Sequence, residues 1–104
     1  MSPEEFVKCC HEEKSSMLAR YFEAPATTAV GIAIGELNLP PSDLARLQSI
    51  LDDVLTDTFM TVLYAIDGCA SLGGRQRNYR LLDEDGTELT GELEGLASEH
   101  FDPR

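Results

Sequence analysis

The apolar pattern is most regular between about residues 43 and 66, where apolar positions recur every three or four residues, as on one face of an α-helix. The positions at this spacing are Leu44, Leu47, Leu51, Val54, Leu55, Thr58, Val62 and Ile66. A helix of this length reaches roughly 36 Å, about the width of a small domain. Its second half, FMTVLYAI at residues 59–66, is apolar on almost every side, so we expect other elements to cover it all round. Gly68 is expected to end the helix in the left-handed conformation.

The N-terminal segment has a second helical pattern. Ser2, Pro3 and Glu5 predict a capping box and a helix that begins at residue 3 and ends by Pro25. The stripe expected to face the core comprises Phe6, Cys10, Met17, Leu18 and Tyr21. The residues expected to face water are Glu12, Glu13 and Lys14. The helix is therefore predicted to be amphipathic, with its charges outside.

Two shorter segments also favour helix. AVGIAIGEL at residues 29–37 alternates like a strand, but a threonine at 27 or 28 offers an N-cap and the apolar spacing suits a helix. Its two glycines each cost about 1 kcal/mol against alanine in a helix, unless they mark a close helix–helix approach. After the linker NLPPS, Ser42 is expected to cap the long helix. Thr90 is expected to cap a last helix whose inner face is Leu93, Leu96, Ala97 and Phe101.

Between the long helix and the last one, the pattern predicts a β-hairpin. Residues 76–82 carry Tyr79 and Leu81 on one face of a strand, and Asp85-Gly86 predicts a turn onto residues 87–89. Two strands are marginal alone, so the hairpin is expected to lie against the helices. The predicted fold class is α+β: a mainly helical single domain over residues 1–104, with three or four helices around the long central helix and one β-hairpin near the C-terminus.

The charge of the chain narrows its partners. Its 19 acidic and 8 basic side chains give a formal net charge of −11, on a chain with an ordinary apolar content of 42%. This charge repels phosphate, so we expect neither nucleic acid nor an anionic membrane as partner, and it steers the chain toward a basic protein. Solubility alone is the competing explanation for the acidity.

Cysteine usage and hydropathy indicate the compartment. The cysteines Cys9, Cys10 and Cys69 are odd in number and two are adjacent, which disfavours a disulfide framework and suggests reduced thiols. The sequence opens without a basic-then-apolar leader, and no apolar run approaches the length of a membrane span. We therefore expect a cytoplasmic protein.

Candidate sites for metal, nucleophile or phosphate are weak. The residues that match a calcium loop are Asp83, Asp85, Gly86 and Glu92. Leu81 stands where that loop needs its first aspartate, so a charged turn is the better interpretation. Cys10 and His11 are neighbours in a helix and point in different directions, while a pair of Cys69 with His100 stays open. GGRQR at residues 73–77 lacks the ending of a P-loop, and whether it has another role stays open. We expect no catalytic residues, no metal and no cofactor.

Carboxylates are the remaining candidates for a binding surface. Asp53 and Asp57 lie four residues apart and share a face of the predicted long helix, where they repel each other slightly. An acidic stripe that meets basic residues of a partner explains this arrangement, and a merely solvated face is the alternative. The predicted partner-binding residues are Asp52, Asp53, Asp57, Asp83, Glu84, Asp85 and Glu88.

The C-terminal half resembles a group of small acidic bacterial proteins that are similar to toxin-immunity proteins. The resemblance is carried by IDGCASLGG at residues 66–74, by Tyr79, by DEDG at residues 83–86 and by LTGELE at residues 89–94. It implies a cytoplasmic protein that neutralises a basic toxin domain by binding and occlusion, and it brings no catalytic residues. The alternative from another class is a small regulatory or adaptor protein that acts as a homodimer; an enzyme is the third and weakest hypothesis.

Overall fold

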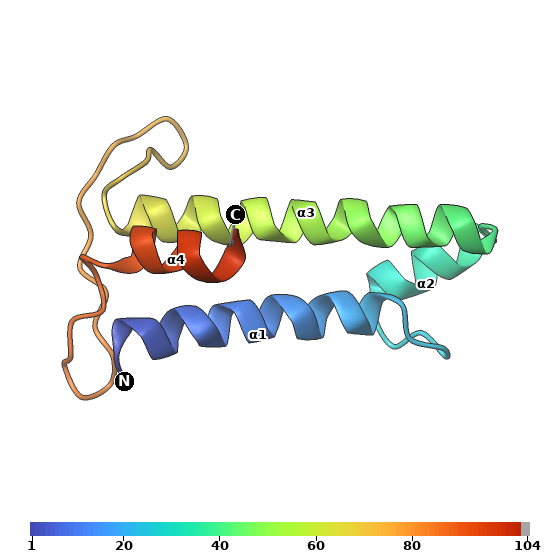
Figure 1. Ribbon diagram of the computed structural model, residues 1–104, viewed down its shortest axis with the longest axis horizontal. Helices are drawn as coiled ribbons and strands as arrows, with labels where there is room; N and C mark the ends of the chain where they lie inside the picture. The colour runs from blue at the N-terminus through green and yellow to red at the C-terminus, as the bar shows by residue number, and fades with distance from the viewer. Residues whose placement is uncertain (103–104) are drawn as a thin grey trace.

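The computed structural model describes residues 1–102, and within them the chain forms four α-helices and no β-sheet. The helices are α1 (Pro3–Tyr21), α2 (Ala29–Glu36), α3 (Pro41–Ile66) and α4 (Leu93–Phe101). Helices α1 and α3 run side by side in opposite directions, α2 joins them at one end, and α4 packs against both at the other end (Figure 1). The result is an elongated body of 46 × 29 × 26 Å.

The core lies at the end of the molecule that α4 covers. Its buried residues are Val7, Leu63, Leu93, Ala97 and Phe101, one or more from each of α1, α3 and α4. The ring of Phe59 stacks on that of Phe101 with centroids 5.7 Å apart, and the Tyr64 hydroxyl is hydrogen-bonded to the Ser98 hydroxyl. Since α4 has only nine residues, it covers one half of the seam between α1 and α3. Beyond Phe101, the last residue of α4, the rest of this seam is not covered by α4.

Local signals for helix ends are largely confirmed. The Ser2 hydroxyl accepts from the Glu5 amide at 3.1 Å and the Glu5 carboxylate accepts from the Ser2 amide at 3.2 Å, so the capping box forms as predicted. Thr28 caps α2, and Gly68 takes the predicted left-handed conformation with φ of 78°. Pro40, rather than the expected Ser42, is the N-cap of α3, because Pro41 already occupies the first helical position.

Helix α4 is capped by a residue from the end of α3. The Asp67 carboxylate accepts hydrogen bonds from the backbone amides of Gly91 and Glu94, the latter at 3.2 Å. The Glu94 amide belongs to the first turn, where a helix leaves its donors without intrahelical partners, and a carboxylate there also suits the helix dipole. The prediction that Thr90 caps this helix was wrong: its hydroxyl donates to Glu88 instead. Asp67 thereby ties the end of α3 to the start of α4.

The predicted β-hairpin is absent from the described residues, so the α+β fold class was wrong. The turn at Asp85-Gly86 does form, with Gly86 at φ of 82°, but only the single bridge Leu82↔Glu88 follows it. Residues 71–80 are all exposed, and the Gln76 side chain donates to the Gly68 carbonyl at 2.6 Å, which holds this segment back toward the end of α3. Leu81 and Leu89 pack against the core, but residues 76–80 are exposed, so the rest of a two-stranded ladder would lack the apolar support that it needs.

Candidate functional site

Three of the predicted partner-binding residues lie together in one groove. The groove has a volume of about 380 Å³ and opens beside α3, where α4 ends. It is lined by Lys14, Asp52, Asp53, Thr56, Asp57, Met60, Phe101 and Asp102. Helical spacing explains the pair Asp53 and Asp57, which are one turn apart on α3, and Asp52 precedes Asp53 directly. The structure therefore brings Asp52, Asp53 and Asp57 to one surface, which we call the acidic groove.

Lys14 in the acidic groove was predicted to face water and is instead buried, with 8% of its surface exposed. Its ammonium group donates to Asp52 Oδ1 at 2.8 Å and to the Thr56 hydroxyl at 3.2 Å, and it lies 5.9 Å from the centre of the Phe101 ring. A buried ammonium is stable only when it is paired and hydrogen-bonded, and these three neighbours meet that need. One signal could have revealed it: Lys14 follows buried Val7 by seven residues, so both lie on the same helix face.

The charge of the acidic groove is strongly negative even after Lys14 is counted. Asp52 is neutralised by the ion pair with Lys14, whereas neither Asp53 nor Asp57 makes an ion pair with a described residue. Both of these carboxylates are exposed at the rim. Two unneutralised carboxylates one turn apart can accept hydrogen bonds from a guanidinium or ammonium group. The arrangement is therefore suited to a basic side chain from outside the chain.

The other predicted acidic residues lie elsewhere, in the turn near the N-terminus of α1. Asp83 accepts hydrogen bonds from the backbone amides of Asp85 and Thr87, each at 2.9 Å, and its other carboxylate oxygen lies 3.0 Å from the N-terminal amine. The bond from the Thr87 amide, followed by that from the N-terminal amine, lowers the pKa of Asp83. Arg80 pairs with Glu88 at 3.2 Å and lowers the pKa of Glu88.

Asp83 and Glu88 thus stabilise the turn through hydrogen bonds and an ion pair within the chain, which agrees with a charged turn rather than a calcium loop. They do not join the acidic groove. Glu84 and Asp85 are exposed on the same turn and stay a separate candidate surface.

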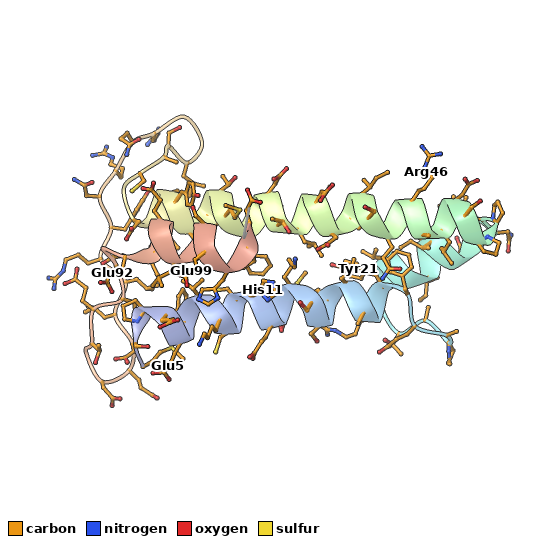
Figure 2. All side chains as sticks on the ribbon, in the orientation of Figure 1. Glu5, His11, Tyr21, Arg46, Glu92 and Glu99 are labelled. Carbon is orange, nitrogen blue, oxygen red and sulfur yellow. The ribbon has the colours of Figure 1, made fainter. Side chains whose placement is uncertain are left out.

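The surroundings of His11, Cys10 and Cys69 shift the pKa of each side chain. His11 points from α1 into the space beside α4, where its ring packs in a T-shape against that of Phe101 with centroids 5.2 Å apart, and burial lowers its pKa (Figure 2). Burial raises the pKa of Cys10. A hydrogen bond with Glu94 raises the pKa of Cys69 to about 11, the opposite of what an attacking thiolate needs. Among residues 1–102, no group of three or more His, Cys, Asp or Glu side chains is arranged to hold a metal ion.

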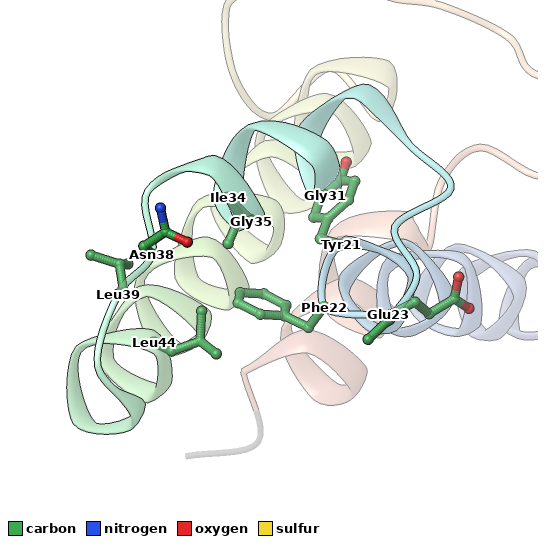
Figure 3. Close-up of a pocket in the computed structure, with 10 residues that line it drawn as sticks. Tyr21, Phe22, Glu23, Gly31, Ile34, Gly35, Asn38, Leu39 and Leu44 are labelled. Carbon is green, nitrogen blue, oxygen red and sulfur yellow. The ribbon is translucent and has the colours of Figure 1, made fainter.

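A second pocket, smaller than the acidic groove, lies at the end of the molecule that holds α2. It has a volume of about 220 Å³ and opens where the end of α1, α2 and the start of α3 meet (Figure 3). The Phe22 ring points across it toward Leu44 and Gly35. A Cβ atom on Gly35 would meet nothing within 4 Å, whereas one on Gly31 would lie 3.2 Å from the Tyr21 carbonyl oxygen. Gly31 therefore marks the close helix approach that the sequence left open, and Gly35 only widens the pocket.

No known family model matches the chain, and neither a curated protein nor a solved structure matches it. None of the helices within residues 1–102 combines the length and the apolar character needed to cross a membrane.

Proposed function

We infer that this chain is a non-catalytic binding protein of the immunity type, which acts in the cytoplasm and neutralises a basic toxin domain by binding and occluding it. The observation that carries this inference is the acidic groove, where Asp53 and Asp57 flank an ion pair that has already neutralised Asp52. The likeness of the C-terminal half to immunity proteins favours this role over other binding roles.

The acidic groove suits a basic side chain better than a small substrate. A hydrogen bond from a guanidinium or ammonium group to a carboxylate contributes about 0.2–1 kcal/mol while the pair stays exposed, and about 1.5–3 kcal/mol where the partner covers it and excludes water. The floor holds Lys14, whose buried ammonium group is already committed to Asp52 and Thr56. The N–H donors of Lys14 therefore point toward the interior, and the rim carboxylates Asp53 and Asp57 stay available to a partner.

The net charge of −11 supports the same role at longer range. A field of this sign attracts a cationic protein and raises its association rate by about 10-fold to 1,000-fold at low ionic strength. Fast capture benefits a protein that must block a toxin before the toxin acts. Steering and the acidic groove thus act on the same partner, one on the rate of encounter and the other on the lifetime of the complex.

The test is survival of cells that express the product of the neighbouring gene. We expect cells to survive only when this protein is co-expressed, and we expect the double variant Asp53→Asn/Asp57→Asn to lose protection. The matched control is Glu84→Gln/Asp85→Asn, which removes two carboxylate charges from the exposed turn near the N-terminus of α1, outside the acidic groove. Equal killing with and without the wild-type protein would remove the inference for that pair, and loss of protection by the control alone would move the contact to the turn.

A further inference from the structure

The outer face of α3, on the side away from α1 and α4, carries exposed apolar residues. Ile50, Val54 and Val62 are 58%, 50% and 40% exposed, and the exposed Thr58 continues their spacing. They stand four residues apart, so each lies about one turn further along α3 and about 40° further around it, and together they form a stripe that winds slowly along the helix. Val62 belongs to the segment 59–66 that the sequence predicted to be covered all round. The chain leaves this side of the segment open.

The surface area of the chain is larger than that of a compact monomer. Its accessible surface is 6902 Å² for 11.4 kDa, whereas a compact monomer of that mass exposes roughly 5,800 Å². The surplus of roughly 1,100 Å² exceeds the ~800 Å² per partner that a standard stable interface buries. The radius of gyration also exceeds that of a compact monomer. It is 16.2 Å, whereas a compact chain of this length has about 13 Å and one of twice the length about 17 Å.

We propose that a second copy of this chain covers the stripe, with the two α3 helices packed antiparallel about a two-fold axis. The charges at the two ends of α3 favour this antiparallel orientation over a parallel one. Arg75 and Arg77, in the loop after α3, make no ion pair with a described residue, and neither do Glu36 and Asp43 at the other end of α3. Figure 1 shows the loop standing beyond α3 on the side away from α1.

Antiparallel pairing brings this arginine loop to the start of the partner's α3, where Glu36 and Asp43 outnumber the exposed Arg46, and two-fold symmetry repeats the contact at the other end (Figure 2). Parallel pairing would set the arginine loops against each other and the acidic ends against each other, which is unfavourable. The exposed Leu72 in the loop and Leu37 before α3 extend the apolar surface at these same two ends. The contact is thus apolar along its middle and complementary in charge at both ends.

The dimer and groove binding are distinguished by their response to salt. Groove binding to a basic partner weakens as salt rises, because it is a contact between opposite charges. The dimer buries an apolar stripe between two chains that each carry a charge of −11. Salt screens this repulsion as well as the attraction at the two ends, so we expect the dimer to depend on salt far less than groove binding does.

The experiment is light scattering of the purified full chain over a range of concentrations, at 50 and 500 mM NaCl. We expect a mass of about 23 kDa, twice the 11.4 kDa of the chain, at both salt concentrations. Val54→Asp, at a half-exposed site where the fold tolerates a charge, is expected to raise the dimer dissociation constant by at least about a hundredfold with unchanged helicity. The control Ser49→Asp adds the same charge about 140° around α3 and is expected to leave the dimer intact.

A wild-type mass of 11.4 kDa at every concentration overturns the proposal, as does a Val54→Asp variant that dimerises like the wild type. A different protein that co-purifies on the stripe overturns it too. Disulfide trapping then tests the orientation, in a background with serine or alanine in place of the native cysteines. Val54→Cys, near the middle of α3, is expected to link to its own copy, whereas Val62→Cys is not. Equal linking at both positions contradicts the antiparallel arrangement.

Discussion

The ion pair between Lys14 and Asp52 predicts an unequal response to the loss of either partner. The ammonium group is buried, while the Asp52 side chain is 45% exposed to water. Asp52→Asn therefore leaves a buried cation with only the Thr56 hydroxyl, an amide oxygen and the Phe101 ring around it. Lys14→Met removes the cation, keeps an apolar stem of similar length in the same place, and leaves a carboxylate that water can solvate.

The two costs follow from these surroundings. Weakening a charge-assisted hydrogen bond to a buried group costs about 1.5–3 kcal/mol, and full loss of a buried partner about 3–5 kcal/mol. Because Asp52 is half-exposed and asparagine still accepts a hydrogen bond, we expect about 1.5 kcal/mol for Asp52→Asn. For Lys14→Met we expect a change within about 0.5 kcal/mol, since the desolvation cost of the ammonium disappears together with its pairing.

The assay is urea unfolding followed by circular dichroism on both single variants and the double variant. We expect the double variant to regain most of the stability that Asp52→Asn loses, because the unpaired cation is then gone. A Lys14→Met variant that loses as much stability as Asp52→Asn, or more, would refute the reasoning. Such a result would mean that the ammonium group stabilises the fold by more than its burial costs.

Three further predictions concern backbone fit, thiol chemistry and pH. Gly31→Ala is expected to lower the free energy of unfolding by about 1 kcal/mol, because the new Cβ would lie 3.2 Å from the Tyr21 carbonyl oxygen. Gly35→Ala meets no such neighbour and is expected to gain up to about 1 kcal/mol of helix propensity. Equal urea midpoints for the two variants would contradict this. Cys69 is expected to react slowly with a thiol reagent at pH 8 because its pKa is raised to about 11, and Glu94→Gln is expected to speed the reaction about tenfold or more; an unchanged rate would show that Glu94 does not hold the thiol. The lowered pKa of Asp83 means that its contribution to stability is complete above the unfolded value near 4 and is lost as pH falls through the lower folded value; Asp83→Asn is expected to lower the urea midpoint at pH 7 and to flatten its acid limb, and parallel curves for the two proteins would count against the assignment.

Features set by neighbours in the sequence were predicted well. The capping box at Ser2 and Glu5, the left-handed Gly68 and the long α3 depend on residues a few positions apart, which a sequence displays directly. The pair Asp53 and Asp57 is likewise a consequence of helical spacing, so its place on one surface followed once α3 was recognised.

Features set by distant contacts were missed. The β-hairpin pattern at residues 76–89 was sound locally, and Leu81 and Leu89 do pack against the core. Residues 76–80 are exposed, however, and Gln76 ties them to Gly68 instead of a strand partner. Lys14 was assigned to water because it is charged, yet Asp52, 38 residues away, supplies the partner that makes its burial stable. Asp67 replaced Thr90 as the cap of α4 for the same reason: the carboxylate comes from another helix.

The central claim is that the acidic groove binds a basic partner through Asp53 and Asp57. The most direct measurement is calorimetric titration of the purified toxin domain, identified by the survival test, against wild-type protein and the Asp53→Asn/Asp57→Asn variant at 50 and 300 mM NaCl. We predict that the variant binds at least about tenfold more weakly and that its affinity varies less with salt, since two charge-assisted contacts are gone. An affinity and a salt dependence equal to those of the wild type would contradict the claim.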